Sequence, residues 1–416
     1  MSVFHKSVGA LALATVLIGG NAYAADVIKI ALIAPLSGVF ALQGENHRRH
    51  AQLAVEQTNA QGGVLGGKQF ELVVLDGQVS PQESILALQR AIDQGSRYVV
   101  QGNASSITFA LRDAIEKHNR RNPERAVLLL NAYGNDPALV NERCSFWHFR
   151  FDAGIDMKMQ ALTNYIATQP GIRKVYLINQ DYAYGHSWTK EAREMLTASR
   201  PDIQIVGDDL HALGKVKDFS PYVAKIMASG ADTVMTGNWG NDLTLLIKAG
   251  KDSGLKADYL TFWANTAGSP AGIGDAGVGH VKVVGQWFAN VGNARATAMV
   301  DAYQKRFPTS ADDILSTTHN SAMAMLVKAM EQAKSTEPLQ VARALEGMRW
   351  LGDTGEVQMR ADNHQLIQPL FIASLAKADG KKVKFDAEHT GNGFRVDHRV
   401  EGKDTAMPTT CKMERP

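Results

Sequence analysis

The sequence predicts an α/β protein of two successive lobes, each built on a parallel sheet with helices on both faces. Short runs rich in Val, Ile and Leu alternate with amphipathic stretches of helical length, and this alternation occurs in two series along the chain. The size of the chain supports two lobes, because 416 residues with 45% apolar side chains can form two cores of roughly 150 to 200 residues each.

The first series starts at the β-rich run Val27–Ala34, which is followed by a loop with Pro35 and Gly38. Strand-like and helix-like segments then alternate as far as Leu130. The predicted strands are Val27–Ala34, Phe70–Leu75, Tyr98–Gln101 and Ala126–Leu130, and the predicted helices are Glu45–Gln61, Pro81–Gln94 and Ser106–Asn119.

The second series follows Phe149–Phe151 and repeats the same alternation, which predicts a second lobe of the same class. Its predicted helices are Met157–Thr168, Ser187–Ala198, Ser220–Ala228 and Asn241–Ser253. Its predicted strands are Lys174–Ile178, Gln204–Asp208, Thr233–Thr236, Tyr259–Phe262 and Val281–Trp287.

The end of the chain departs from this alternation. Three helices are predicted in succession, at Ala294–Arg306, Leu315–Ala333 and Pro338–Gly347. After them, Gly355–Met359 and Pro369–Ala376 are predicted to pair as strands around a turn at Asp362–Asn363.

Residues 1–24 have the pattern of a secretory signal. His5 and Lys6 precede an apolar run, Val8–Ile18, and Ala22–Ala24 has the Ala-x-Ala form of a cleavage site. The apolar run is too short to cross roughly 30 Å of hydrocarbon as a helix. We expect an exported mature chain that starts near Ala25 and carries no lipid anchor, because no cysteine lies near the cut. The alternative is a buried N-terminal helix.

The charge balance and the cysteines restrict the function further. Forty-four Lys+Arg against 42 Asp+Glu give a net charge of +2, which argues against a nucleic-acid partner. Cys144 and Cys411 have no CxxC spacing for zinc or redox chemistry. They form an even pair in an oxidising compartment, so a disulfide is possible. Sequence alone does not show whether the two lie close together.

The sequence offers no catalytic, metal or cofactor signature. GxxxxGK[ST], HExxH and GxSxG are all absent from the sequence. The GxGxxG letters at 272–277 precede a predicted strand, so a plain glycine-rich loop is expected there. His47 and His50 could share a helix face but have no nearby third ligand, so we expect a solvated helix start. These absences argue against an enzyme.

A stretch of sequence at Ala54–Gly67, followed by Leu72–Asp76, carries a family resemblance. With these residues the chain resembles the branched-chain amino-acid-binding (leucine/isoleucine/valine type) periplasmic binding proteins of ABC importers. The resemblance covers essentially all of residues 26–375. Further matching stretches are Tyr98–Val100, Ser105–Ser106, Asn135–Pro137, Asp181–Gly185, Lys217–Phe219, Ala231–Asp232 and Gly254–Lys256.

This resemblance implies two Rossmann-like lobes joined by a three-crossover hinge, the type I periplasmic binding protein fold. Lobe 1 would comprise 26–150 plus 286–355, and lobe 2 would comprise 151–285 plus 356–416. The lobes close on a small ligand at the carboxyl ends of their strands. The resemblance also implies a periplasmic monomer that delivers its ligand to an ABC permease in the inner membrane.

The resemblance also implies where a ligand carboxylate binds. In the family a serine just after the third strand holds it, and Ser105 falls at this position, followed by Ser106. A helix N-terminus there favours an anion, although the alternative is that one serine is only the N-cap. A hydroxyl residue after the fourth strand falls in Tyr133, Gly134 and Asn135. There, Asn135 replaces the usual threonine and would donate through its amide.

Three further positions determine which ligand is expected. Tyr184 and Trp239 match cleft aromatics of the family, whereas Trp263 stands where amino-acid binders place the acid that pairs with the ligand's α-ammonium. An indole supplies no charge, and burying an unpaired ammonium is costly. With Phe40 and Tyr133, these residues predict an aromatic-lined cleft for a small carboxylate, preferably an aromatic acid.

Three alternatives remain open from the sequence. An α-amino acid could still bind if Asp181 or Asp242 paired with its ammonium. The same fold could serve a periplasmic ligand sensor instead of an importer. A secreted hydrolase is the least favoured alternative, because no set of nucleophile, base and orienting residue is evident.

Overall fold

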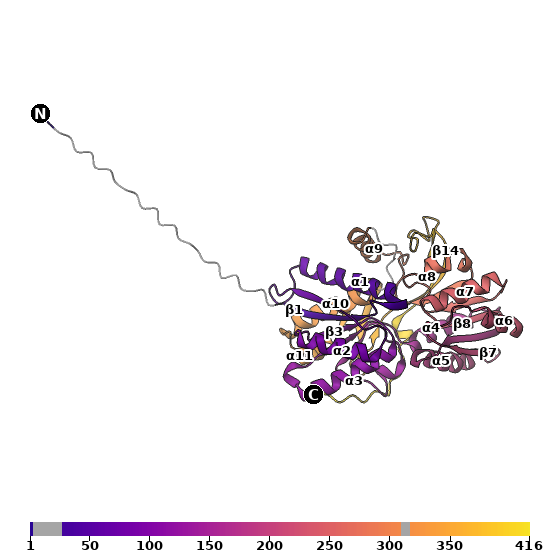
Figure 1. The fold of residues 1–416 in the computed structure, drawn as a ribbon, viewed down its shortest axis with the longest axis horizontal. Coiled ribbons are helices and arrows are strands. Elements are labelled where there is room, and N and C mark those ends of the chain that lie inside the picture. The colour runs from indigo at the N-terminus through magenta and orange to yellow at the C-terminus, as the bar shows by residue number, and fades with distance from the viewer. Residues whose placement is uncertain (3–26, 309–316) are drawn as a thin grey trace.

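The computed structural model describes residues 1–2, 27–308 and 317–416. The predicted signal and its cleavage site therefore fall almost entirely outside the described residues. Two α/β lobes lie side by side, one around a five-stranded sheet and the other around a seven-stranded sheet (Figure 1). The predicted fold class of two lobes with parallel sheets is confirmed.

Lobe 1 holds the five-stranded sheet, in which all neighbouring strands are parallel. In spatial order its strands are β2 (Phe70–Asp76), β1 (Ile28–Ala34), β3 (Tyr98–Gln101), β4 (Leu128–Asn131) and β5 (His148–Arg150). Its helices are α1 (Ala41–Ala60), α2 (Pro81–Asp93), α3 (Ser105–Arg121), α10 (Thr318–Ala333) and α11 (Pro338–Leu345). The sequence did not predict β5, which has only three residues.

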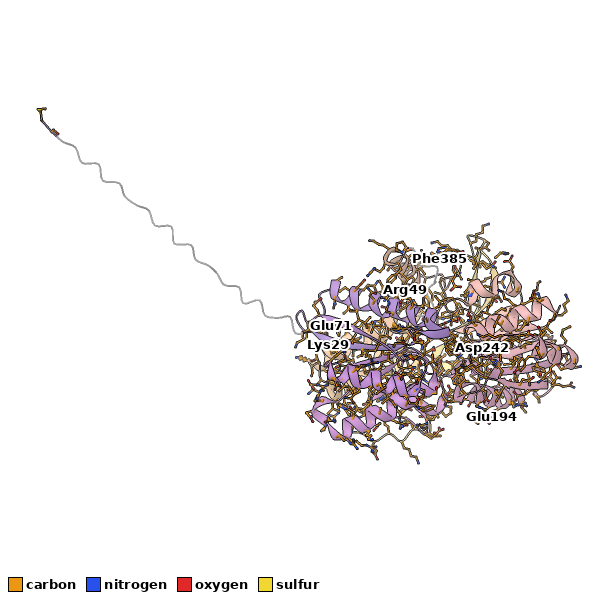
Figure 2. All side chains as sticks on the ribbon, in the orientation of Figure 1. Lys29, Arg49, Glu71, Glu194, Asp242 and Phe385 are labelled. Carbon is orange, nitrogen blue, oxygen red and sulfur yellow. A yellow bond between two sulfur atoms is a disulfide. The ribbon has the colours of Figure 1, made fainter. Side chains whose placement is uncertain are left out.

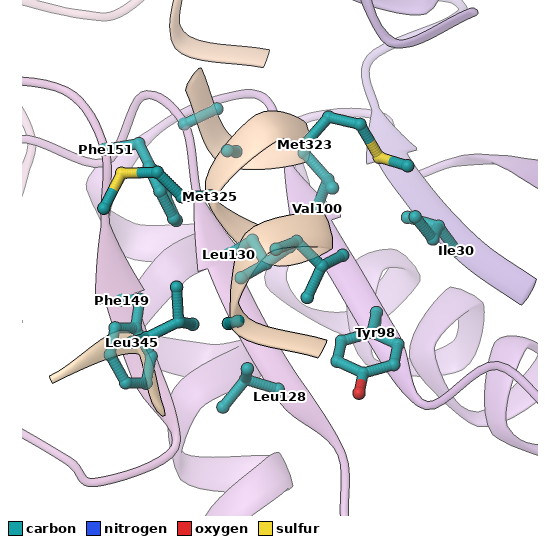
Figure 3. Packing of buried hydrophobic residues seen from close by; sticks show 14 of the residues in the cluster. Ile30, Tyr98, Val100, Leu128, Leu130, Phe149, Phe151, Met323, Met325 and Leu345 are labelled. Atoms are coloured by element: carbon teal, nitrogen blue, oxygen red, sulfur yellow. The ribbon is translucent and has the colours of Figure 1, made fainter. Parts of the chain in front are cut away.

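The core of lobe 1 explains why the late helices return to it. Helix α10 lies across the sheet, and Met323 and Met325 pack with Val100 and Leu130 of the strands (Figure 3). Burying a side chain of this size contributes about 1.5–3 kcal/mol. The return of α10 to the first sheet therefore follows from the apolar face that β3 and β4 would otherwise expose.

Local sequence sets where the helices of lobe 1 begin. In α2, the Ser80 hydroxyl accepts the backbone N–H of Glu83 at 3.3 Å, and Pro81 occupies the first turn. Both features are typical of a helix start. In α1, a Cβ on Gly44 would lie 1.9 Å from the Pro35 carbonyl oxygen, so only glycine allows the helix to approach this loop.

Lobe 2 holds a mixed sheet of seven strands. In spatial order they are β15 (Asn392–Val400), β14 (Leu370–Lys377), β10 (Val281–Gly285), β9 (Asp258–Thr261), β8 (Thr233–Thr236), β6 (Lys174–Gln180) and β7 (Gln204–His211). The helices are α4 (Ile155–Ala167), α5 (Ala183–Ser199), α6 (Ser220–Ser229), α7 (Asn241–Asp252) and α8 (Ser269–Ile273). Strands β14 and β15 run antiparallel to their neighbours.

The predicted pairing of Gly355–Met359 with Pro369–Ala376 is wrong. Strand β12 (Gly355–Met359) pairs with β11 (Arg349–Gly352) and β13 (Leu366–Ile367) in a separate three-stranded sheet. Strand β14 pairs instead with β10 and β15. Its first six residues are all buried, which fits a strand with a neighbour on each side.

The remaining short elements connect the lobes or cap their sheets. Helix α9 (Ala294–Arg306) packs against α1 through Leu53 and Val300. The 3₁₀ turns are η1 (Gly38–Phe40), η2 (Pro123–Arg125), η3 (Pro137–Val140), η4 (Gly274–Gly277) and η5 (Gly402–Asp404). The GxGxxG letters thus lie at α8 and η4, ahead of β10 and not after a strand.

The predicted lobe boundaries remain a proposal, in which we move the third crossover. Val357, Met359 and Leu366 are buried in the lobe 1 core, whereas β14 belongs to the sheet of lobe 2. We therefore place the third crossover near Gln368 instead of at 355/356. We keep the first two crossovers after β5 and β10.

The last residues return once more to lobe 1. Cys411 forms a disulfide with Cys144, so the pair that the sequence left open is joined. The C-terminus lies beside lobe 1 in Figure 1, where Arg343 of α11 donates to the Pro416 carbonyl oxygen at 2.7 Å. Residues after η5 therefore form a further, covalently anchored connection between the lobes. No helix among the described residues has the length and apolar character needed to span a membrane.

Candidate functional site

A cavity lies between the lobes, next to the carboxyl ends of strands from both sheets. Its empty volume is about 560 Å³, which includes the opening to solvent. Lobe 1 contributes α1, the loops after β1, β3 and β4 and the first residue of α3, and lobe 2 contributes the loops after β6, β8 and β9 and the start of α5. The lining residues are Pro35, Gln43, His47, Gly102, Asn103, Ala104, Ser105, Tyr133, Asn135, Tyr182, Tyr184, Trp239, Trp263 and Thr266.

The structure brings most of the predicted ligand-binding residues to this cavity. Ser105, Tyr133, Asn135, Tyr184, Trp239 and Trp263 line it. Phe40 stands behind Trp239, with its ring centroid 4.1 Å away in a stacked arrangement.

Ser106 and Gly134 are not among the lining residues. A Cβ on Gly134 would lie 2.1 Å from Thr108 Oγ1. Close packing against α3 therefore explains the glycine at this position.

Ser105 is held so that its hydroxyl can donate a hydrogen bond. Its Oγ accepts the backbone N–H groups of Asn135 and Asp136, each at 3.2 Å. With both lone pairs engaged, the O–H is the group left for a ligand. Helix α3 begins at Ser105 and its N-cap is Ala104. The alternative that Ser105 or Ser106 is only the N-cap is therefore wrong.

Asn135 does not supply the donor that the sequence suggested. Its Nδ2 donates to the Asp152 carboxylate at 2.8 Å and to the Ala153 carbonyl at 2.7 Å. Both N–H groups are used in the first crossover, because the loop after β4 is tied to the loop after β5. Among the described residues the buried Oδ1 of Asn135 has no partner. Asn135 therefore presents an acceptor and cannot donate to a carboxylate.

Asn103 offers a donor that sequence reasoning missed. The residue is 6% exposed and lines the cavity two positions before Ser105. Its Oδ1 accepts from Gln101 Nε2 at 3.4 Å, while its Nδ2 has no partner among the described residues. The signal was present in the sequence, since Asn103 lies in the same loop after the third strand as Ser105.

Two tryptophan–tyrosine pairs form the lobe 2 wall. Trp239 Nε1 donates to the Tyr182 hydroxyl at 2.9 Å, and Trp263 Nε1 donates to the Tyr184 hydroxyl at 2.5 Å. Burial raises the pKa of both tyrosines, so they stay neutral. The indole N–H groups are therefore not free for a ligand. Tyr182 is a second lining residue that the sequence did not single out.

A buried ion pair lies on the far side of Trp263. Lys158 Nζ is 4.3 Å from the centroid of the Trp263 ring and 3.1 Å from Asp152 Oδ2. Both charged side chains are at most 1% exposed. The position that pairs with an ammonium in amino-acid binders thus holds an indole that has a lysine behind it.

The two carboxylates that could replace the missing acid are engaged elsewhere. Asp242, which Figure 2 shows toward the junction of the lobes, accepts from Gln180 Nε2 and from the Gly214 N–H, each at 2.8 Å. Asp181 bonds His186 at 2.8 Å. Neither lines the cavity, and none of its fourteen lining residues is acidic or basic other than His47.

Three buried histidines stand at and behind the lobe 1 wall. His47 lines the cavity with its ring centroid 4.2 Å from that of Tyr133, and His319 and His50 follow behind it. Burial lowers the pKa of His50 to about 3 and that of His319 to about 4. The expected solvated helix start is therefore wrong for His47 and His50. The part of the chain that the structure describes contains no group of three residues suited to a metal ion.

The lobes contact each other across the cleft. Gln43 Nε2 of α1 donates to the Ala267 carbonyl oxygen of lobe 2 at 3.0 Å. At another point Ser187 Oγ of α5 donates to Asp136 Oδ2 of lobe 1 at 2.6 Å. These contacts and the stacking of Phe40 on Trp239 describe a closed arrangement.

Comparisons with known proteins agree with this architecture. A family model described as periplasmic binding protein matches residues 27–381. The Leu/Ile/Val-binding protein homolog 4 of Brucella melitensis is 30% identical over 433 residues, which cover 100% of this chain and 99% of the relative. The leucine-, isoleucine-, valine-, threonine-, and alanine-binding protein of Pseudomonas aeruginosa is 25% identical and covers 80% of this chain and 86% of the relative.

Solved structures show the same two-lobe fold. The leucine-, isoleucine-, valine-, threonine-, and alanine-binding protein of Brucella ovis, in a closed conformation, has a TM-score of 0.83 at 28% identity and covers 94% of this chain and 100% of its own. A Rhodopseudomonas palustris solute-binding protein of an ABC transporter, in complex with 3,4-dihydroxybenzoic acid, has a TM-score of 0.77 at 18% identity and covers 91% and 98%. The chain therefore belongs to the periplasmic binding protein family, a family of binding proteins and not of enzymes.

Proposed function

We propose that this protein is the solute-binding protein of an ABC importer and that its ligand is a small carboxylate without an α-ammonium group, preferably an aromatic acid. The observation that carries the proposal is the composition of the cavity wall. It presents aromatic rings and neutral polar groups, and no Asp or Glu lines it.

The carboxylate would bind at the start of α3. The Ser105 hydroxyl is free to donate, and the Nδ2 of Asn103 has no partner among the described residues. Neutral donors suffice in a site shielded from water, because hydrogen bonds to an ionised acceptor are strong there. The N-terminus of the 17-residue helix α3 adds a favourable field for an anion.

The rest of the ligand would lie among aromatic side chains. Tyr133 of lobe 1 and Tyr182, Tyr184, Trp239 and Trp263 of lobe 2 line the cavity. Rings that stack or meet edge to face gain about 0.5–1.5 kcal/mol beyond the burial of area. A flat aromatic ligand makes fuller use of such walls than a branched aliphatic one.

An α-ammonium would be poorly accommodated at Trp263. The indole carries no negative charge, and the charge of Lys158 against its ring is already paired with Asp152, so no free carboxylate is offered to an ammonium there. A buried ammonium without a carboxylate partner is costly. This electrostatic arrangement favours an anionic ligand over a zwitterionic one.

Location and partner complete the proposal. We place the mature protein in the periplasm as a monomer, released by cleavage of a signal at 1–24 and without a lipid anchor. Its partner would be an ABC permease in the inner membrane. Closure of the two lobes would present the bound ligand to that permease.

A branched-chain amino acid is the second candidate. Both the Brucella melitensis relative, at 30% identity over the full chain, and the Brucella ovis structure carry names that refer to such ligands. The free oxygens of Gln43 and Asn135 could accept N–H groups of an ammonium. This candidate requires neutral oxygens to replace the missing acid.

A matched pair of ligands tests the proposal. 3-(4-Hydroxyphenyl)propanoate and L-tyrosine differ only in the α-ammonium, and their binding to ligand-stripped mature protein is measured by calorimetry and thermal shift alongside hydroxybenzoates and L-leucine. A ligand at a hundred times its Kd adds about 2.7 kcal/mol to stability. We expect stabilisation by the acids without an amino group. Tight binding of L-leucine or L-tyrosine and not of these acids would refute the proposal and favour the second candidate.

A further inference from the structure

Two amide oxygens at the cavity wall have no hydrogen-bond partner among the described residues, Oε1 of Gln43 and Oδ1 of Asn135. The two residues are 8% and 1% exposed. Both belong to lobe 1, on α1 and on the loop after β4 respectively. Buried acceptors of this kind are normally satisfied in proteins.

The orientation of each amide is fixed by its other end. Gln43 Nε2 faces the Ala267 carbonyl oxygen, which can only accept. Asn135 Nδ2 faces a carbonyl and a carboxylate oxygen, which likewise only accept. Exchanging nitrogen and oxygen would set acceptor against acceptor in both places. Oε1 and Oδ1 are therefore acceptors, and both belong to residues that line the cavity.

A ligand that lacks a suitable donor would leave these buried oxygens unpaired. Sites built to bond a ligand hydroxyl discriminate strongly against analogues without it, because the polar groups of the site then lose their partners. A well-matched ligand would therefore carry a hydrogen-bond donor as well as a carboxylate and an aromatic ring.

We propose that the ligand carries a hydrogen-bond donor, such as a ring hydroxyl, in addition to its carboxylate, and that Gln43 is the residue that selects for it. This inference rests on the proposed function, because it names a further feature of the same ligand. The Gln43 amide bonds lobe 2 with its nitrogen, while its oxygen has no partner among the described residues. Selection of the donor and contact between the lobes therefore share one side chain.

Gln43 is a better probe of this selection than Asn135. The Asn135 amide also holds Asp152 in the first crossover, so changing it would disturb the hinge. Gln43 lies on α1, and among the described residues its side chain makes one hydrogen bond, the contact with Ala267. Replacing Gln43 with methionine keeps the length of the side chain and removes both polar ends.

The test compares Kd values for benzoate with those for 2-, 3- and 4-hydroxybenzoate, by calorimetry on the ligand-stripped mature protein. We expect at least one hydroxybenzoate to bind tenfold or more tightly than benzoate, which corresponds to about 1.4 kcal/mol. In Gln43→Met this ratio should fall to within about threefold. A second variant, Gln43→Leu, should behave alike. Gln52→Met, on the same helix outside the cavity, is the matched control and should keep the wild-type ratio.

The outcomes separate the inference from the proposed function. Equal binding of benzoate and all three hydroxybenzoates, or an unchanged ratio in Gln43→Met, would overturn the inference while leaving a carboxylate binder. If only L-leucine binds, the proposed function fails, and 4-methylpentanoate then serves as the analogue without its donor. A Gln43→Met variant that still prefers L-leucine over this analogue as strongly as wild type would overturn the inference as well. Failure of both ligand classes to bind would overturn both.

Discussion

The two walls of the cavity differ in how their polar atoms are satisfied. Lobe 1 faces the cavity with amide groups whose free ends have no partner among the described residues, as in Gln43, Asn103 and Asn135. Lobe 2 faces it with tryptophans and tyrosines that have paired their polar atoms with one another. Unpaired hydrogen-bonding groups are therefore concentrated on lobe 1 and aromatic surface on lobe 2.

This division suits a protein whose two lobes close on a ligand about a hinge. A ligand that meets lobe 1 first finds its hydrogen-bond partners there, and closure of lobe 2 then adds aromatic surface over it. Ligand contacts with both lobes favour the closed state. The hydrogen bonds of the lobe 1 wall and the ring contacts of the lobe 2 wall would therefore both add to affinity. Changes on one wall should therefore alter selectivity for polar groups, and changes on the other should alter selectivity for shape and charge.

The largest effect is expected where one ion pair supports both walls. Asp152 accepts from Asn135 of the lobe 1 wall, and Lys158 lies against the ring of Trp263 in the lobe 2 wall. Lys158→Met would leave the Asp152 carboxylate buried without its charged partner. We expect a loss of about 3–5 kcal/mol in the free energy of unfolding, measured by urea denaturation.

Two controls sharpen this first prediction. Lys190→Met removes an exposed lysine of α5 and should cost at most about 1 kcal/mol. The double variant Lys158→Met with Asp152→Asn should regain part of the loss, because no unpaired charge is then buried. A loss below 1 kcal/mol in Lys158→Met alone would show that the pair does not support the two walls.

The next largest effect should come from returning an acid to the lobe 2 wall. In Trp263→Glu a carboxylate would face an anionic ligand, and the ring surface would be lost. We expect the affinity for aromatic acids to fall about a hundredfold, or about 2.7 kcal/mol, as measured by calorimetry. Trp263→Phe is the control and should stay within about tenfold of wild type. Unchanged ligand preference in Trp263→Glu would remove the charge argument from the proposed function.

Most of the fold could be predicted from the sequence, because apolar periodicity is a local signal. The range Ala294–Arg306 is the same in the prediction and in α9. The sequence did not predict strand β5, because its three residues are too few to show an apolar periodicity. The pairing of β12 with β14 was predicted wrongly. The partner of a strand depends on which sheet has an open edge, and the spacing of strands along the sequence does not show this.

The candidate site was predictable only in part. Residues on loops after strands, such as Ser105 and Trp239, could be placed because strand ends meet at one edge of a sheet. Gln43 and His47 lie within a helix, where polar residues are normally solvated, and their burial results from the second lobe and from α10. The Asn135 amide donates to Asp152, a residue of the crossover beside it. The sequence of the loop that holds Asn135 does not show that this acceptor lies close to it.

A smaller effect is expected from the serine that helps to define the lobe 1 wall. Ser105→Ala removes the hydroxyl donor and also the acceptor for two backbone N–H groups. We expect carboxylate affinity to fall about tenfold to a hundredfold, since bonds to charged groups contribute about 1.5–3 kcal/mol. Ser106→Ala, which is next in sequence but does not line the cavity, is the control measured in the same calorimetric titration. Equal losses in the two variants would contradict the assignment of Ser105 to the ligand.

The smallest effect, per pH unit, distinguishes the two walls by their response to acid. The buried His50 and His319 have pKa values of about 3 and 4, whereas an unfolded chain has a histidine pKa near 6.5. Below pH 6.5 the unfolded state therefore binds more protons than the folded state, so stability is lost as pH falls toward 4. Each such histidine contributes a slope of up to about 1.4 kcal/mol per pH unit. The tyrosines of the lobe 2 wall stay neutral through this range because burial raises their pKa.

Urea denaturation between pH 8 and pH 5 should show a shallower slope of stability against pH in His50→Gln than in wild type. Because the slope is the quantity compared, a loss of packing in the variant does not affect the conclusion. Identical slopes would mean that acid acts elsewhere in the molecule and that the histidines behind lobe 1 do not distinguish its wall from that of lobe 2.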